Sequence, residues 1–131
     1  MAADERRVIV VDAANVVGSR PDGWWRDRAG AARRLLAALA ASAELPGGVV
    51  VVLEGAARAV AGEGFPGLRV ELAEGSGDDA IVDVVAEAVG AGSGPVTVVT
   101  ADRGLRGRVE ALGAETVGPR WLLERIERTA R

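Results

Sequence analysis

The sequence has 131 residues, the size of one ordinary domain, and a formal net charge of −3 at pH 7. Histidine, cysteine, tyrosine and lysine are absent, so all 16 basic residues are arginine. This composition excludes imidazole bases, thiolate nucleophiles, Schiff-base lysines and Cys/His zinc sites, so any catalysis must use carboxylates helped by Asn, Ser, Thr and Arg.

Strands and helices are predicted to alternate along the chain. Runs of valine and other β-branched residues predict strands at 7–12, 49–54, 95–102 and 114–118. Residues 68–73 alternate between apolar and polar and predict a shorter, more exposed strand. Apolar residues at helical spacing predict helices over 22–45, 76–92, 103–113 and 119–130, with a short helix or loop at 55–67. This alternation indicates a single α/β domain over 1–131, with an open five-stranded parallel sheet between two layers of helices.

Details of two helices can be predicted more closely. Helix 22–45 has an apolar stripe formed by Trp25, Ala29, Ala32, Leu36, Leu39 and Ala43. Helix 76–92 begins with the capping-box spacing of Ser76 and Asp79. Segment 16–28, which contains both adjacent tryptophans, is predicted to include a loop that overhangs the end of the first strand.

Acidic residues recur where the predicted strands end. Asp12, Glu54 and Asp102 close the first, second and fourth strands, and the third is followed by Glu74, Asp78 and Asp79. In open α/β sheets, ligands bind beyond the carboxyl ends of the strands. A single acid of this kind is often only the N-cap of the next helix. Asp12 departs from that pattern, because the next predicted helix begins only at residue 22.

Carboxylates that converge on one edge repel one another. Two carboxylates about 5 Å apart repel by roughly 3 kcal/mol at an effective dielectric near 20, or about two pKa units. Protons or a cation must offset this repulsion. Because no His or Cys ligand is available, the oxygen donors suit a hard cation such as Mg²⁺ or Mn²⁺.

Three segments resemble the NYN domain of the PIN-like nuclease superfamily, and the resemblance covers nearly the whole chain, from the first predicted strand to the fifth. The segments are "VVDAAN" at 10–15, "GSGDDAIVD" at 75–83 and "VVTADRGLRGRVEALGAETVG" at 98–118. They are similar to the family's D-x-x-N motif at Asp12 and Asn15, its acidic pair at Asp78 and Asp79, and its [ST]-x-D motif at Thr100 and Asp102. "VLEG" at 52–55 is similar to an acid-Gly pair after the second strand of some PIN-like nucleases.

The resemblance implies strand order 3-2-1-4-5 and metal-dependent hydrolysis of RNA. It implies that Asp12, Asp79 and Asp102 bind one or two Mg²⁺ or Mn²⁺ ions, with Asp78 as a direct or water-mediated ligand. Asn15 would orient Asp12 or a water, while Thr100 and Glu54 would support the cluster. Arg103 and Arg106 stand where several relatives carry a further acid, which puts the second metal and the full reaction rate in question.

Residues near this edge are predicted to bind substrate. Phosphate contacts are expected from an arginine rim round the site, formed by Arg20, Arg26, Arg28, Arg103, Arg106 and Arg120. Trp24 or Trp25 would stack a base, which favours single-stranded RNA over a duplex. The structural alternative is that at least one of these tryptophans anchors its helix to the core.

Three functions remain open on the residues alone. The leading one is a Mg²⁺- or Mn²⁺-dependent ribonuclease. The second is a metal-dependent nucleotide phosphohydrolase or pyrophosphohydrolase, which the same acids would serve. The third is a catalytically weakened module that binds nucleotide or RNA. A phospho-receiver domain is excluded because it needs a lysine, which this sequence lacks.

The sequence gives weaker indications about partners and location. No apolar run approaches the roughly 18 residues of a membrane span, and the charged start of the chain lacks the apolar core of a secretory signal. We therefore expect a cytoplasmic protein without membrane contact, either monomeric or homo-oligomeric. The net negative charge argues against tight, metal-free binding of long nucleic acids.

Overall fold

A parallel five-stranded sheet lies at the centre of the computed structural model, which describes residues 7–42, 45, 48–92 and 94–130. Its strands are β1 (Val8–Asp12), β2 (Gly48–Leu53), β3 (Leu68–Leu72), β4 (Val96–Val99) and β5 (Glu115–Val117). All four strand pairings are parallel, in the order β3-β2-β1-β4-β5. The predicted order 3-2-1-4-5 is confirmed.

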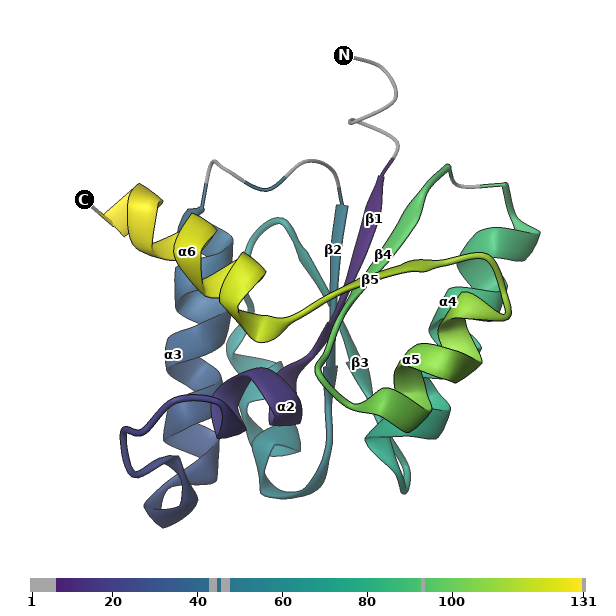
Figure 1. Ribbon diagram of the computed structural model, residues 1–131. Helices are drawn as coiled ribbons and strands as arrows, with labels where there is room; N and C mark the ends of the chain where they lie inside the picture. Colours follow the sequence, from purple (N-terminus) through teal and green to yellow (C-terminus); the bar gives the residue numbers. More distant parts are fainter. Residues whose placement is uncertain (1–6, 43–44, 46–47, 93, 131) are drawn as a thin grey trace.

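Helices cover both faces of the sheet (Figure 1). One face carries α2 (Ala13–Gly18), α3 (Arg28–Ala41), the 3-10 helix η2 (Gly55–Glu63) and α6 (Pro119–Ala130). The other carries α4 (Gly77–Gly90) and α5 (Arg103–Glu110). A short 3-10 helix, η1 (Trp24–Arg26), precedes α3. Within the described part of the chain, no helix combines the length and apolar character needed to cross a bilayer.

Alternate residues of the central strands build two separate halves of the core. Ile9 and Val11 of β1 pack with the α3 and α6 side, whereas Val10 packs with the α4 and α5 side. All three side chains are fully buried. Because successive residues of a strand point to opposite faces, a sheet covered on both sides requires continuous apolar runs. This requirement explains the unbroken valines of the sequence.

The segment after β1 differs from the sequence-based expectation. Helix α2 starts at Ala13, directly after the strand, so Asp12 is its N-cap. The argument that Asp12 has no nearby helix to cap was therefore wrong. The predicted helix 22–45 begins only at Arg28, where the Asp27 side chain accepts a hydrogen bond from the Gly30 N–H at 2.9 Å.

The prediction of an apolar stripe on that helix is correct for its middle and wrong for its start. Ala32, Leu36 and Leu39 are buried in the core. Trp25 lies before α3 and is 55% exposed, so it does not anchor the helix. Ala29 is partly buried against the core, and Ala43 lies outside the described residues.

Candidate active site at the carboxyl edge of the sheet

Asp12 is a buried carboxylate at the end of β1, with 7% of its surface exposed. Its Oδ2 accepts a hydrogen bond from Thr100 Oγ1 at 2.8 Å, and its Oδ1 accepts one from the Asn15 N–H at 3.4 Å. Burial raises the pKa of Asp12; the two hydrogen bonds oppose this effect, while the charges of Asp78 and Glu54 add to it. A positive charge beside Asp12 would therefore stabilise its ionised carboxylate.

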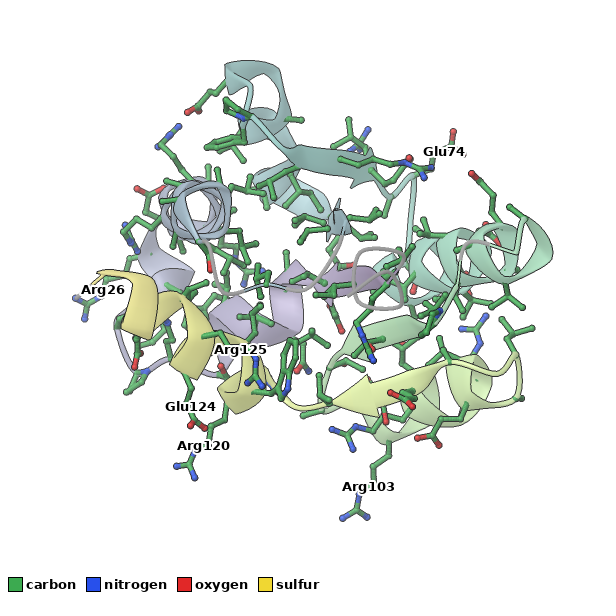
Figure 2. The ribbon with its side chains drawn as sticks, turned by 90° about the horizontal axis from the view of Figure 1, so that it is seen from above. Arg26, Glu74, Arg103, Arg120, Glu124 and Arg125 are labelled. Atoms are coloured by element: carbon green, nitrogen blue, oxygen red, sulfur yellow. The ribbon has the colours of Figure 1, made fainter. Side chains whose placement is uncertain are left out.

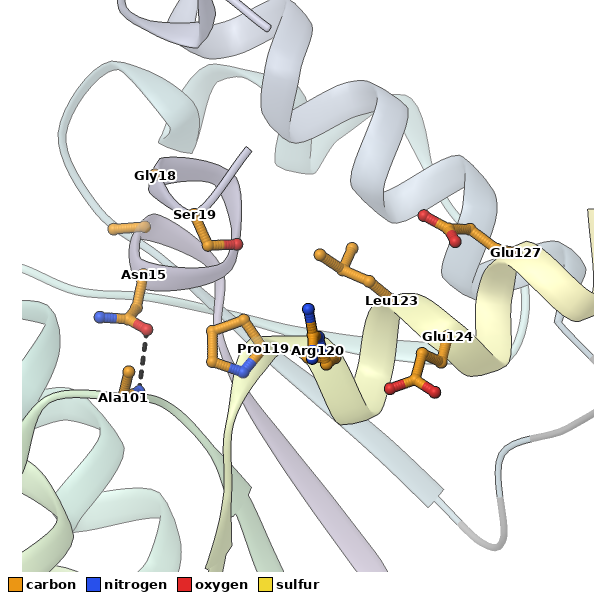
Figure 3. Close-up of a pocket in the computed structure, with 10 residues that line it drawn as sticks. Asn15, Gly18, Ser19, Ala101, Pro119, Arg120, Leu123, Glu124 and Glu127 are labelled. Carbon is orange, nitrogen blue, oxygen red and sulfur yellow. Dashed lines mark hydrogen bonds between the residues drawn. The ribbon is translucent and has the colours of Figure 1, made fainter. Parts of the chain in front are cut away.

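Thr100 and Asn15 connect the ends of β1 and β4. Besides donating to Asp12, the Thr100 hydroxyl accepts a hydrogen bond from the Asp102 N–H at 3.1 Å. Asn15 Oδ1 accepts from the Ala101 N–H at 2.9 Å (Figure 3). Thr100 thus contacts the acids as expected. Asn15 differs from the expectation, because its amide holds the loop after β4 and only its backbone N–H contacts Asp12.

Glu54 follows β2 and reaches across to the start of α4. Its Oε2 accepts a hydrogen bond from the Gly77 N–H at 2.7 Å. Gly77 is buried, and a Cβ built on it would lie 2.8 Å from Glu54 Oε2 and 3.0 Å from the carboxyl carbon. A side chain at position 77 would therefore push Glu54 away. The requirement for glycine here comes from the carboxylate rather than from the backbone angles.

We expect Gly77→Ala to lower the free energy of unfolding by about 1–2 kcal/mol, because the added methyl group displaces the Glu54 carboxylate and breaks its hydrogen bond to the N–H of residue 77. Gly107→Ala in α5 is the matched control, since nothing lies within 4 Å of the Cβ it would add. It should be neutral or stabilise by up to about 1 kcal/mol, as Gly to Ala does in a helix. Urea unfolding measures both; equal midpoints would contradict this prediction.

Of the acidic pair that opens α4, Asp78 is the member coupled to the other acids. Burial raises the pKa of Asp78, and the charges of Asp102 and Glu54 raise it further, whereas Arg108 opposes them. Asp79 instead lies 3.0 Å from Arg108 Nη2, and its side chain is 71% exposed. The structure therefore differs from the expectation that Asp79 joins Asp12 and Asp102. Ser76 does cap α4, accepting from the Asp78 N–H at 3.2 Å.

Asp102 completes a set of four acids at this edge. It is exposed and caps α5, accepting a hydrogen bond from the Leu105 N–H at 2.9 Å. We call Asp12, Glu54, Asp78 and Asp102 the acidic cluster. Its donors are all carboxylate oxygens, and the charges of its members raise the pKa values of Asp12 and Asp78, which suits Mg²⁺ or Mn²⁺. Among the described residues, no three acids already stand close enough to hold a metal ion.

The candidate substrate-binding arginines are spread over the surface of the molecule and are not gathered at the acidic cluster. Arg26, Arg103 and Arg120 project outward from its outline (Figure 2). Arg20 Nη2 lies 3.9 Å from Glu127 Oε1. Arg106, which was also expected in the arginine rim round the site, instead donates from Nε to the Thr100 carbonyl at 2.9 Å. It therefore positions the loop that carries Thr100 and Asp102.

Two pockets flank α2. The α6 pocket, of about 730 Å³, lies between α2 and α6 and includes Asn15, Ser19 and Arg120 in its lining (Figure 3). The Trp24 pocket, of about 340 Å³, lies between α2, η1 and the start of η2. Ala14 lines both. These pockets were not predicted from the sequence, because helix α2 was not predicted. The one signal for α2 in the sequence was Asp12, an acid in the position of a helix N-cap.

Comparison with known proteins identifies the fold. No protein-family model and no curated protein matches the sequence. The chain is similar to crystal structures of Rae1 (YacP) from Bacillus subtilis, with a TM-score of 0.77 both for that protein and for a Trp-to-Leu variant. Identity is 20% with the variant, over 95% of this chain and 77% of the other. With the unsubstituted protein it is 19%, over 95% and 75%. The chain therefore shares the α/β fold of Rae1.

Proposed function

We propose that this protein is a Mg²⁺- or Mn²⁺-dependent ribonuclease that hydrolyses RNA phosphodiesters at the acidic cluster. The observation that carries the proposal is the electrostatic coupling of acids from separate elements. The charges of Asp78 and Glu54 raise the pKa of Asp12, and the charges of Asp102 and Glu54 raise the pKa of Asp78. The PIN-like fold supports it, because the superfamily that the sequence resembles consists of nucleases and carries its acids at this edge.

Asp12, Asp78 and Asp102 would hold the cation, with Glu54 beside them. This choice replaces Asp79 by Asp78, because Asp79 is paired with Arg108. When bound, the cation supplies positive charge that neutralises the phosphoryl oxygens and acidifies the attacking water. Thr100 fixes the orientation of the Asp12 carboxylate through its hydroxyl. Asn15 and Arg106 hold the loop that carries Thr100 and Asp102 through the Ala101 N–H and the Thr100 carbonyl.

The direct test compares two substrates. End-labelled single-stranded RNA and nucleoside triphosphates are incubated separately with the protein and Mn²⁺, and strand cleavage and phosphate release are measured. We expect RNA to be cut at internal bonds, with EDTA abolishing the reaction. Turnover of the triphosphate alone would replace the ribonuclease by a nucleotide phosphohydrolase. Turnover of neither would leave a module that binds RNA or nucleotide.

We expect millimolar Mn²⁺ or Mg²⁺ to raise the melting temperature, with EDTA reversing the shift. A cation that binds only the folded state stabilises by mass action, by about 2.7 kcal/mol at one hundred times its dissociation constant. Asp78→Asn should reduce the shift, because it removes a member of the acidic cluster. Asp83→Asn is the matched control on α4, since Asp83 is exposed and makes no contribution to the pKa shifts of Asp12 or Asp78 given above. Scanning fluorimetry in which Asp83→Asn loses the shift and Asp78→Asn keeps it would contradict the placement.

A further inference from the structure

The Trp24 pocket adjoins the acidic cluster directly. Ala13, which lines it, follows Asp12 in the chain, and Glu54 is both a lining residue and a member of the cluster. Its volume of about 340 Å³ is at the lower end of the roughly 300–1,000 Å³ of small-molecule sites. That size suits one planar group and excludes a stacked duplex.

The lining of the Trp24 pocket combines an aromatic ring, small apolar groups and two charges of opposite sign. The remaining lining is mostly small, including Ala14, Ala56 and Ala57. The Arg28 guanidinium carbon lies 5.2 Å from the centre of the Trp24 ring. By comparison, that of Arg125 lies 3.9 Å from the Trp121 ring. Arg28 is exposed, so it covers the Trp24 ring only loosely and remains able to meet an anionic group at the pocket mouth.

Glu54 gives the Trp24 pocket a hydrogen-bond acceptor. One of its oxygens already accepts the Gly77 N–H, but a carboxylate has about four lone-pair positions and can accept further bonds. Carboxylates recognise the amino group of cytosine in this way. Uracil presents a carbonyl oxygen at the same position, which a carboxylate repels. The pocket therefore favours a base that carries an amino group.

We propose that the Trp24 pocket binds one unstacked nucleobase with an exocyclic amino group, held by the Trp24 ring and Glu54. The inference rests on the proposed ribonuclease function, because it assumes that this base belongs to the RNA that is cut at the acidic cluster. A base seated here places its own sugar-phosphate beside the start of α2 and the Arg28 guanidinium. Trp24 and Glu54 are then specificity residues for the nucleotide next to the bond that is cut.

Mononucleotides test the pocket without any cleavage or metal. The three tryptophans give three indole N–H signals in a nitrogen-15 NMR spectrum, and the signal missing in Trp24→Ala identifies Trp24. Cytidine 5′-monophosphate should shift this signal saturably and by more than ribose 5-phosphate, which has no base and can meet only Arg28. Binding should be at least about fivefold tighter for cytidine than for uridine 5′-monophosphate, as for a hydrogen bond to a charged acceptor. Glu54→Gln should remove this preference.

Matched variants separate the pocket from the general surface. Ala56→Leu fills the pocket from an exposed position of η2 and should weaken cytidine monophosphate binding by at least about fivefold, the lower end for a stacked base. Ala59→Leu, exposed on the same helix but outside the lining, should bind like the wild type. The Ala56→Leu and Ala59→Leu variants keep the test valid even if Trp24→Ala fails to fold.

Several results would overturn the inference. They are an unchanged Trp24 signal with cytidine monophosphate, an equal shift with ribose 5-phosphate, or normal binding by Ala56→Leu. Equal affinity for the cytidine and uridine nucleotides would overturn the role of Glu54. A protein that binds cytidine monophosphate here but never cuts RNA would refute only the ribonuclease. One that cuts RNA while the Trp24 signal stays unchanged would refute only the base pocket.

Discussion

An Asp12→Asn protein is expected to fold normally and to cleave RNA about 10²–10⁴-fold more slowly than the wild type, the range for removing a positioned catalytic group. Asparagine keeps the shape of the side chain and is as good an N-cap as aspartate, so α2 retains its cap. The Asn15 N–H and the Thr100 hydroxyl bond different oxygens of Asp12. In the variant, the amide oxygen keeps the Asn15 N–H and the amide NH₂ donates to Thr100 Oγ1 instead. What is lost is the negative charge at the centre of the acidic cluster.

Asp79→Asn is the matched control for this substitution. Asp79 has the same side chain at the same edge, but it is mostly exposed and paired with Arg108. Because an exposed ion pair contributes little, the cleavage rate should stay within about twofold of wild type. Multiple-turnover assays on labelled RNA measure both rates. Equal losses of cleavage rate in the two variants would mean that Asp79 belongs to the acidic cluster. Full activity of Asp12→Asn would mean that the reaction takes place at another site.

Thr100→Val is expected to lower the free energy of unfolding by about 2–3 kcal/mol at neutral pH, because it removes a hydrogen bond to a buried charge. Thr100 is fully buried and its hydroxyl donates to Asp12 while accepting from the Asp102 N–H. Valine has nearly the same shape but satisfies neither partner. For a domain of this size the loss corresponds to a fall in melting temperature of roughly 6–15 °C.

The penalty of Thr100→Val should depend on pH. The Thr100 hydrogen bond lowers the pKa of Asp12 against the larger raising effect of burial. Without that bond the pKa of Asp12 rises further, so the ionised carboxylate is less favourable in the fold. The penalty is therefore full above the folded-state pKa. It shrinks as pH falls from the higher folded-state pKa of Asp12 in the variant to the lower one in the wild type, both of which lie above the ordinary value of 3.8.

Two controls separate this effect from simple loss of a buried hydroxyl. Thr100→Ser keeps the donor and should lose much less stability. Thr97→Val removes a buried hydroxyl at the amino end of the same strand, where it accepts from Arg7 Nη1 at 2.7 Å. Its penalty should vary much less across the same acid range, because the carboxylate that shares Arg7 with it, Glu115, is mostly exposed and lies 3.5 Å from Arg7 Nη1. Unfolding by urea at several pH values measures all three, and a pH-independent penalty for Thr100→Val would contradict the role given to its hydroxyl.

The sheet was predictable because its physical requirement is visible residue by residue. A strand buried on both faces must be apolar at every position, and 8–11 and 49–53 meet that requirement. The order of the strands came from the resemblance to the NYN domain, since burial alone does not state which strand neighbours which. The acids at the strand ends followed from the parallel direction of all five strands.

Helix α2 was not predictable from its own residues. It is six residues long and contains Val16, Val17 and Gly18, which all have low helix propensity. Its stability comes from the Asp12 cap and from the burial of Ala13 and Val16 in the core. Both contributions depend on the tertiary fold, so a reading of local pattern gave a loop instead.

The choice between Asp78 and Asp79 was also beyond sequence reasoning. Adjacent residues of a helix point about 100° apart, so only one of the two can face the cluster. Which one does so depends on how α4 is rotated against the sheet. That rotation is set by the burial of Ile81 and Val85 and by the Glu54 contact to Gly77. The exposed partner of the pair then found Arg108 on α5.

Three of the acids are bonded to the starts of three helices. Asp12 accepts the Asn15 N–H in α2, Asp102 the Leu105 N–H in α5, and Glu54 the Gly77 N–H in α4. Replacing a capping acid by alanine costs about 0.5–2 kcal/mol of stability whether or not the protein is catalytic. Selection for folding alone therefore preserves much of the acidic edge. A chain of this fold would therefore need these acids at its helix starts even if it catalysed no reaction.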